Sequence, residues 1–137
     1  MSRDHADSIV EANQLLLERG DADAIPRFFA PSYVVHGTGR DARGHAMIRR
    51  FLGEVRGAFH ELRVTVEVLA TDGDCVAWQR TCRATHGGDF KGFPATGRAV
   101  AWRDMLVSRF EDGLIAEEWA VSDLAEHLLR AAKGSAG

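Results

Sequence analysis

The stretch "THGGDFKGFPATGRAVAWRDMLVSRF", residues 85–110, joins two strand-like segments through a loop rich in glycine. Successive side chains of a strand point to opposite faces, so residues two apart share a face. In the second segment, one face carries mainly apolar residues and a single acid: Val100, Trp102, Asp104, Leu106 and Ser108. A carboxylate is costly in a closed apolar core. Asp104 is therefore the residue of this face that a closed apolar core does not explain.

The two-residue period extends to the segments on either side of this stretch. From Leu62 to Val68 apolar and polar residues alternate, and a "TDGD" turn leads into a strand over residues 75–85. One face of that strand carries Val76, Trp78, Arg80, Cys82 and Ala84. After "EDG" a last strand is predicted over residues 114–121. The second half of the chain is thus predicted to be a run of strands joined by hairpins.

Helical patterns dominate the first half of the chain. A capping box, Ser8-x-x-Glu11, predicts a helix over residues 8–19 that ends at Gly20. Asp23 is expected to cap a short helix over residues 24–29, which Pro31 closes. "YVVH", residues 33–36, is typical of a short strand before the "GTGRDARG" loop, and a third helix is predicted over residues 45–59. Ser122 is expected to cap a terminal helix through Arg130.

Helices followed by hairpin-linked strands are typical of the α+β class, with helices gathered on one face of an antiparallel sheet. The 137 residues suit a single domain, 1–137, and residues 1–6 and 133–137 are expected to fray. A curved sheet covered by the N-terminal helices would enclose a pocket between the two layers.

Composition excludes several partners and cofactors. The net charge of -3 gives no general attraction to nucleic acid or to anionic membranes. No apolar run approaches the roughly 18 residues of a membrane span or has the form of a signal peptide, so a cytoplasmic protein is expected. Cys75 and Cys82 lie about 23 Å apart on one strand and are predicted to be free thiols. No metal-binding or dinucleotide-binding motif occurs, so we expect no metal and no cofactor.

Four motifs resemble a known family. They are Thr85-His86-Gly87-Gly88, Gly92-Phe93-Pro94-Ala95-Thr96-Gly97-Arg98, Arg109-Phe110-Glu111-Asp112-Gly113-Leu114-Ile115, and Trp119. Together they resemble the SnoaL-like polyketide cyclases (ester cyclases) of the nuclear-transport-factor-2-like (NTF2-like) superfamily, over nearly the whole chain. The resemblance implies a cone-shaped NTF2-like fold with an internal pocket, in proteins of secondary metabolism that commonly form homodimers through the outer sheet face. This superfamily hosts several reactions and also non-catalytic binders, so the resemblance bears on fold more than on reaction.

The resemblance also implies a mechanism, from which this sequence departs. SnoaL-like cyclases close an aldol ring without a cofactor, using an aspartate on the last strand and a histidine on the preceding one. Those positions fall on Ala120 and Leu106, and neither residue can carry a proton. In the related limonene epoxide hydrolases an arginine lies between two aspartates. The arginine falls on Arg80, the aspartates on Cys82 and Ala120, and the water-holding asparagine near His36.

The candidate catalytic residues are Asp104, His36, Arg80 and Glu118. Asp104 would be a general base or acid, or else a structural partner of Arg80. His36 would accept a proton or orient water, or else be a rim histidine hydrogen-bonded to the following loop. Arg80 would stabilise a developing negative charge. Glu118 is placed inside by the family register, although apolar periodicity predicts that it is exposed. The substrate-binding wall is predicted to include Trp78, Trp102, Leu106, Ala120 and Phe51.

Three functions follow from these candidates. The first is a cyclase of isomerase or lyase type that takes a proton from a small hydrophobic carbonyl compound and closes a ring. The second is an epoxide-opening hydrolase in which His36 and Asp104 hold the water. The third is a non-catalytic binding protein, because both family acid–base positions are lost. We also expect a homodimer, formed through the sheet face that bears Gln79, Thr81, Arg83 and Thr85.

Overall fold

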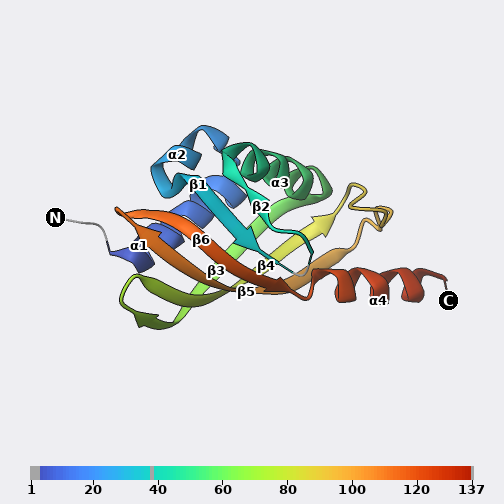
Figure 1. Ribbon diagram of the computed structural model, residues 1–137. Coiled ribbons are helices and arrows are strands. Elements are labelled where there is room, and N and C mark those ends of the chain that lie inside the picture. Colours follow the sequence, from blue (N-terminus) through green and yellow to red (C-terminus); the bar gives the residue numbers. More distant parts are fainter. Residues whose placement is uncertain (1–3, 38, 137) are drawn as a thin grey trace.

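The computed structural model describes residues 4–37 and 39–136, and the side chains of residues 4–37 and 39–133. The helices and strands follow one another in the α+β order expected from the sequence (Figure 1). The elements are α1 (His5–Ala12), the π-helical segment η1 (Asn13–Glu18), the 3-10 turn η2 (Ala22–Ala24), α2 (Ile25–Phe28), β1 (Phe29–His36), β2 (Ala42–Arg43), α3 (Gly44–Ala58), β3 (Phe59–Asp72), β4 (Cys75–His86), β5 (Ala99–Glu111), β6 (Leu114–Ser122) and α4 (Leu124–Ala136).

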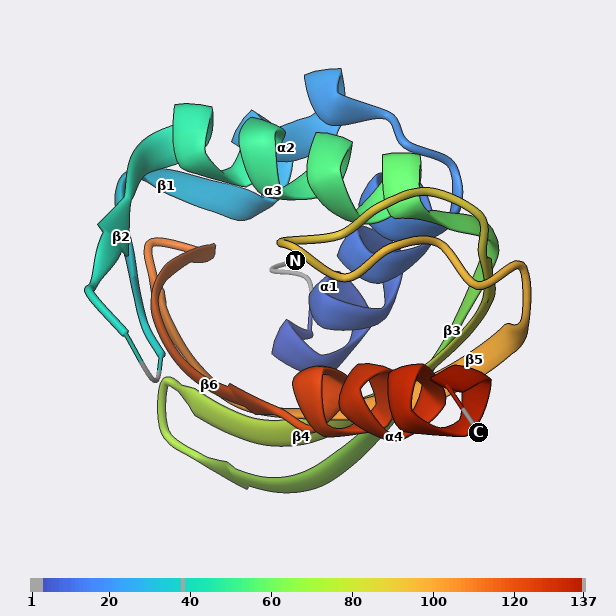
Figure 2. The same cartoon turned by 90° about the vertical axis from the view of Figure 1, so that its right-hand side faces the viewer.

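The six strands form one sheet in the order β2-β1-β6-β5-β4-β3. The strands pair antiparallel except β1 and β6, which are parallel. The expected all-antiparallel sheet is therefore wrong at this one pairing, because β1 comes before the series of hairpins and lies beside its last strand. Viewed end-on, the sheet curves around α1, and α3 closes the opposite side (Figure 2). The curved, unclosed sheet with helices in its concavity is the predicted NTF2-like architecture.

The first helix begins earlier than its capping box suggests. The carboxylate of Asp4 accepts the N–H of Ala6 at 3.1 Å and caps α1. The predicted capping by Ser8 is wrong, because Ser8 is buried within the helix. The helix terminates at Gly20 as expected, at φ +70°. A Cβ there would lie 2.3 Å from the guanidinium of Arg56, which donates to the carbonyls of Leu17 and Glu18.

The second predicted helix is replaced in part by strand. A 3-10 turn leads into α2, which ends at Phe28, and no side-chain cap from Asp23 is present among the described residues. Pro31 lies inside β1 and does not close the helix. The register between β1 and β6 shifts between Phe29 and Val34, so the missing N–H of Pro31 interrupts no regular ladder.

The remaining boundaries differ by a few residues. The two-residue strand β2 lies in the predicted loop, α3 matches its prediction within one residue at each end, and β3 starts three residues early at Phe59. α4 begins where the Ser122 hydroxyl accepts the N–H of Leu124 at 3.1 Å, and it continues past Arg130 to Ala136. Of the ends expected to fray, residues 1–3 and 137 lie outside the described residues. Within the described part, no helix is long and apolar enough to cross a bilayer.

Candidate active site

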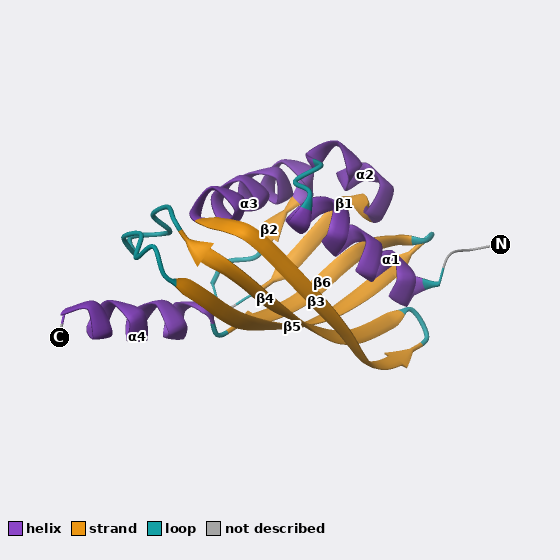
Figure 3. Ribbon diagram, turned by 180° about the vertical axis from the view of Figure 1, so that it is seen from behind, coloured by secondary structure: helices purple, strands orange, loops and turns teal. Residues whose placement is uncertain are grey.

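A cavity of about 520 Å³ lies between the concave face of the sheet and the helices. Its lining comes from α1, η1 and α3, from the inner faces of β1, β3, β4, β5 and β6, and from α4 and the β4–β5 loop. α4 and that loop lie at the same end of the molecule, away from the N-terminal end (Figure 3). Most lining side chains are apolar, which is the composition of a site for a small hydrophobic molecule.

The two positions expected to match the family's acid–base residues are neighbours on the cavity wall. Leu106 on β5 and Ala120 on β6 are directly opposite each other, and both line the cavity as predicted. Two residue pairs further along in each direction lies a carboxylic acid. Asp104 pairs with Ser122, and Glu118 pairs with Ser108. At about 3.3 Å per residue, the Cα atoms of the two acids are separated by roughly 13 Å along the strands.

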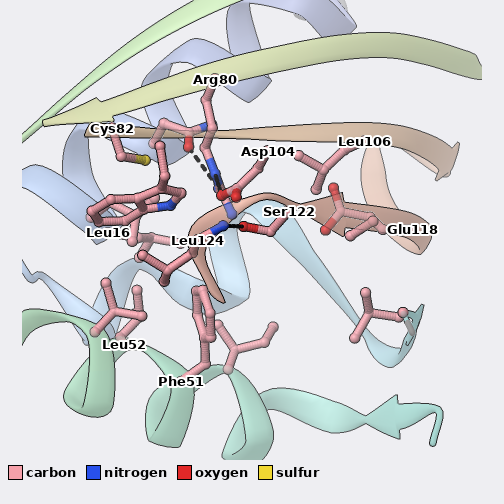
Figure 4. Close-up of a pocket in the computed structure, with 18 of the residues that line it drawn as sticks. Leu16, Phe51, Leu52, Arg80, Cys82, Asp104, Leu106, Glu118, Ser122 and Leu124 are labelled. Carbon is pink, nitrogen blue, oxygen red and sulfur yellow. Dashed lines mark hydrogen bonds and ion pairs between the residues drawn. The ribbon is translucent and has the colours of Figure 1, made fainter. Parts of the chain in front are cut away.

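Asp104 is anchored by one of its two oxygens. Its Oδ2 accepts a hydrogen bond from Nε of Arg80 at 2.7 Å, and the two residues are opposite each other on β5 and β4 (Figure 4). The other oxygen, Oδ1, is buried and has no hydrogen-bond partner among the described residues. Burial lowers the pKa of Arg80, but the charge of Asp104, its hydrogen bond and the other acidic groups nearby together outweigh burial and leave the Arg80 pKa above its ordinary value. The guanidinium therefore stays charged beside Asp104.

Glu118 is buried at 5% exposure and points into the cavity, as the family register predicted. Its Oε1 accepts from the Tyr33 hydroxyl at 2.6 Å, and its Oε2 accepts from the Ser108 hydroxyl at 2.5 Å. Ser108 in turn accepts from the indole N–H of Trp78 at 2.9 Å. Burial raises the pKa of Glu118 more than these two hydrogen bonds and the charge of Arg80 lower it. Glu118 therefore takes up a proton at a higher pH than an exposed glutamate does.

His36 lies outside the cavity, so its predicted role on the inner wall is wrong, whereas the alternative, a hydrogen bond to the following loop, is present in its contact with Asp41. Tyr33 and Val35 line the cavity, and alternation along β1 directs His36 to the other face. There its Nε2 lies 2.6 Å from Glu117 and its Nδ1 lies 2.9 Å from Asp41. The hydrogen bonds to these two carboxylates, Glu117 first, raise the pKa of His36. His36 links β1, β6 and the loop before β2.

The predicted wall residues all line the cavity, in different ways. Trp78 and Trp102 are 3% and 4% exposed, so their side chains are packed into the cavity wall and extend little into the cavity itself. Phe51 on α3 is 37% exposed and lies on the side opposite the sheet (Figure 4). Cys82 also lines the cavity, and burial raises the pKa of its thiol to about 12, so it remains protonated. Cys82 and Cys75 are both free thiols.

Three polar residues of the site were missed as candidates. Tyr33 and Ser108 hold Glu118, and Asn13 accepts from Nη1 of Arg80 at 3.0 Å. Each had a signal in the sequence, because each is a polar residue on a face otherwise made of apolar side chains. Such a signal identifies a position but not its partner, since Tyr33 and Asn13 lie 85 and 67 positions from the residues they contact.

The fold and this site can be compared with known proteins. The model of the family described as SnoaL-like polyketide cyclase matches residues 7–130. The chain belongs to this family. No curated protein sequence is significantly similar to it. Leu106 and Ala120, where this sequence was expected to depart from the family mechanism, both line the cavity of this SnoaL-like protein.

Solved structures of SnoaL-like proteins have the same fold. IdmH, a proposed polyketide cyclase from Streptomyces antibioticus, is 28% identical with a TM-score of 0.76, over 96% of this chain and 99% of that one. AclR, a proposed hydroxylase from Streptomyces galilaeus, is 28% identical with a TM-score of 0.76, over 95% and 83%. A proposed polyketide cyclase from Acidithiobacillus ferrooxidans has a TM-score of 0.82 at 23% identity, over 97% of both chains. Relatives of this one fold are thus proposed to perform different reactions.

Proposed function

We propose that this SnoaL-like protein is a cofactor-free cyclase that removes a proton from a hydrophobic carbonyl compound and closes a ring by an aldol-type step. The observation that carries the proposal is the state of Asp104. One of its oxygens accepts from Arg80, and the other is buried without a hydrogen-bond partner among the described residues, in a residue that lines an apolar cavity. A general base needs this arrangement, because it must be held in place and still have an oxygen free to take a proton.

The proposed steps use the two acids at either side of the Leu106–Ala120 pair. Asp104 takes a proton from the carbon next to a carbonyl group, and the electron pair of the broken C–H bond forms an enolate. The positive charge of Arg80 favours this anion. The enolate carbon then attacks a second carbonyl carbon of the same molecule, forming the new C–C bond. The oxygen of that second carbonyl takes a proton from neutral Glu118, and solvent returns the proton from Asp104 to Glu118.

The epoxide-opening alternative receives less support. It was expected to hold the attacking water with both His36 and Asp104. Asp104 lines the cavity, but His36 lies on the other face of β1. The non-catalytic alternative makes a different experimental prediction, because a binding protein would recognise carbonyl compounds without exchanging their protons.

Proton removal can be tested without the natural substrate. Aryl β-keto esters and naphthyl 1,3-diketones carry acidic C–H groups on hydrophobic molecules that fit a cavity of about 520 Å³. In deuterium oxide, the protein should speed the exchange of these hydrogens above the buffer rate, as followed by proton NMR. Binding seen by quenching of tryptophan fluorescence, with exchange at the buffer rate for every compound, would support the binding protein and reject the cyclase.

Catalysis should not need a metal ion. The described residues contain no group of three or more histidine, cysteine, aspartate or glutamate side chains that could hold one. We expect the exchange rate to be unchanged after exhaustive treatment with EDTA. A rate that falls in EDTA and returns with a divalent cation would contradict the proposed chemistry.

We also propose that two copies associate through the outer face of the sheet. Next to the predicted contact residues on β4, this face exposes three large apolar side chains: Met105, Trp119 and Val121, at 46%, 43% and 57%. The contact is therefore expected to be more apolar than the β4 residues alone suggest. At micromolar concentration, light scattering should give the mass of a dimer.

A charge on the same face should break this dimer. Trp119→Lys places an ammonium group among the exposed apolar residues, and the mass should fall to that of a monomer. Leu129→Lys is the matched control, since Leu129 is 52% exposed but lies on α4. A wild-type monomer, or two variants that behave alike, would reject this interface.

A further inference from the structure

Asn13 lies where the first helix changes its winding. α1 ends at Ala12, and η1 continues with wider π-type turns, as in the hydrogen bond from the N–H of Arg19 to the carbonyl of Gln14 at 3.0 Å. Single π-type turns within helices are often found at functional sites. Asn13 is 6% exposed, lines the cavity and extends toward β4. A polar side chain at this depth needs partners.

The amide of Asn13 has its two ends fixed by two different partners. Its Nδ2 donates to the carbonyl of Ile9 at 2.8 Å, and its Oδ1 accepts from Nη1 of Arg80 at 3.0 Å. A guanidinium offers only donors, and a carbonyl offers only an acceptor. Turning the amide over would therefore break both hydrogen bonds, so chemistry selects one orientation.

Asn13 and Asp104 together determine the plane of the Arg80 guanidinium. Asp104 holds Nε at 2.7 Å from one side, and Asn13 holds Nη1 from another element of the fold. A single hydrogen bond would leave this planar group free to rotate about its contact. Two hydrogen bonds at different nitrogens prevent that rotation. The indole of Trp78 lies 5.6 Å from Cζ of Arg80, measured to the ring centroid, and supports the same position.

We propose that Asn13 is a positioning residue: by fixing the plane of Arg80, it holds Asp104 with Oδ1 placed for proton transfer. The part of this inference that concerns proton transfer rests on the proposed function. The part that concerns Arg80 needs no substrate. The site would then extend from β5 through β4 to the first helix.

The contact itself is tested by NMR of the arginine side chain in the free protein. Asn13→Leu preserves approximate size and removes the amide. The Nη–H signals of Arg80 should broaden and exchange faster with water, while the Nε–H signal persists because Asp104 still accepts it. Asn13→Asp keeps an acceptor oxygen and should keep the Nη–H signals. Gln14→Leu, at an exposed neighbouring position, is the control. Unchanged Arg80 signals in Asn13→Leu would overturn the inference.

The effect on proton transfer is tested by exchange kinetics. Misplacing a catalytic group by about 1 Å can cost up to 10²-fold, so Asn13→Leu should lower kcat about ten- to a hundredfold with little change in KM. In an Asp104→Asn background the same substitution should cause no further loss, because the base it positions is gone. An equal loss in both backgrounds, or a change confined to KM, would overturn the positioning role. If the wild-type protein exchanges nothing, the proposed function fails, and the NMR result still decides whether Asn13 fixes Arg80.

Discussion

Asp104→Asn should lower the rate of hydrogen exchange and of turnover by at least about a hundredfold, since general acid–base catalysis typically contributes 10²–10⁴-fold. The amide matches the carboxylate in size, and its oxygen can still accept from Nε of Arg80. What is lost is the ability of this group to take a proton. Binding, followed by tryptophan fluorescence, should weaken much less than kcat falls.

The same variant separates catalysis from a purely structural ion pair. If Asp104 serves only to neutralise Arg80, its replacement should cost roughly 3–5 kcal/mol of unfolding free energy, with activity per folded molecule within a few-fold of wild type. Asp123→Asn is the matched control, because Asp123 accepts the N–H of Arg103 at 2.7 Å and does not line the cavity. Urea unfolding and exchange measured on one sample decide between the two roles. A stable and fully active Asp104→Asn protein would reject both.

Glu118→Ala should destabilise the fold by about 2–5 kcal/mol, because it leaves a cavity and two buried hydroxyls without their acceptor. Those hydroxyls belong to Tyr33 and Ser108. Glu118→Gln keeps the shape and one acceptor oxygen, so its loss should be smaller. Urea unfolding at one pH gives both values. Equal, small losses would show that the network contributes little to stability.

Comparing Glu118→Gln with wild type over a range of pH tests the state of this acid. Burial raises the pKa of Glu118 above 4.5, its ordinary value. The folded protein then binds this proton more tightly than the unfolded chain, so the contribution to stability is full below pH 4.5 and is lost as pH rises through the folded pKa. The stability of wild type relative to Glu118→Gln should therefore fall from pH 4.5 toward neutrality. A difference that is constant or rises with pH would contradict a raised pKa.

The hairpin-linked strands β3 to β6 were predictable because apolar and polar side chains alternate along them. The inward orientation of Asp104 on β5 follows from that alternation. Glu118 shows where local periodicity misleads. Trp119 and Val121 suggested that the opposite face of β6 is the buried one, yet both are exposed. The outer face of the sheet carries apolar residues of its own, so hydrophobicity alone cannot distinguish it from the cavity face. The family register, which does not depend on hydrophobicity, gave the right orientation.

His36 and the β1–β6 pairing could not be derived from local sequence. In "YVVH" both alternating faces are plausible, and the choice depends on Tyr33 reaching Glu118, 85 positions away. The parallel pairing likewise joins two strands separated by most of the chain. The contact between Asn13 and Arg80 spans 67 positions and requires a helix that departs from 3.6 residues per turn. A regular helical stripe gives no indication of such a departure.

The π-helical segment makes the first helix sensitive to the number of residues it contains. A π turn holds about one residue more than an α turn, and each residue of an α-helix turns the chain by about 100°. Deleting one residue within η1 would allow the segment to close into regular α-helix, and the part before it would rotate relative to Gly20. Asn13 would then face away from Arg80, while the hydrophobic composition of the helix stayed almost the same. In this protein, a change in the number of residues in η1 is therefore expected to be more damaging than a substitution of its exposed residues.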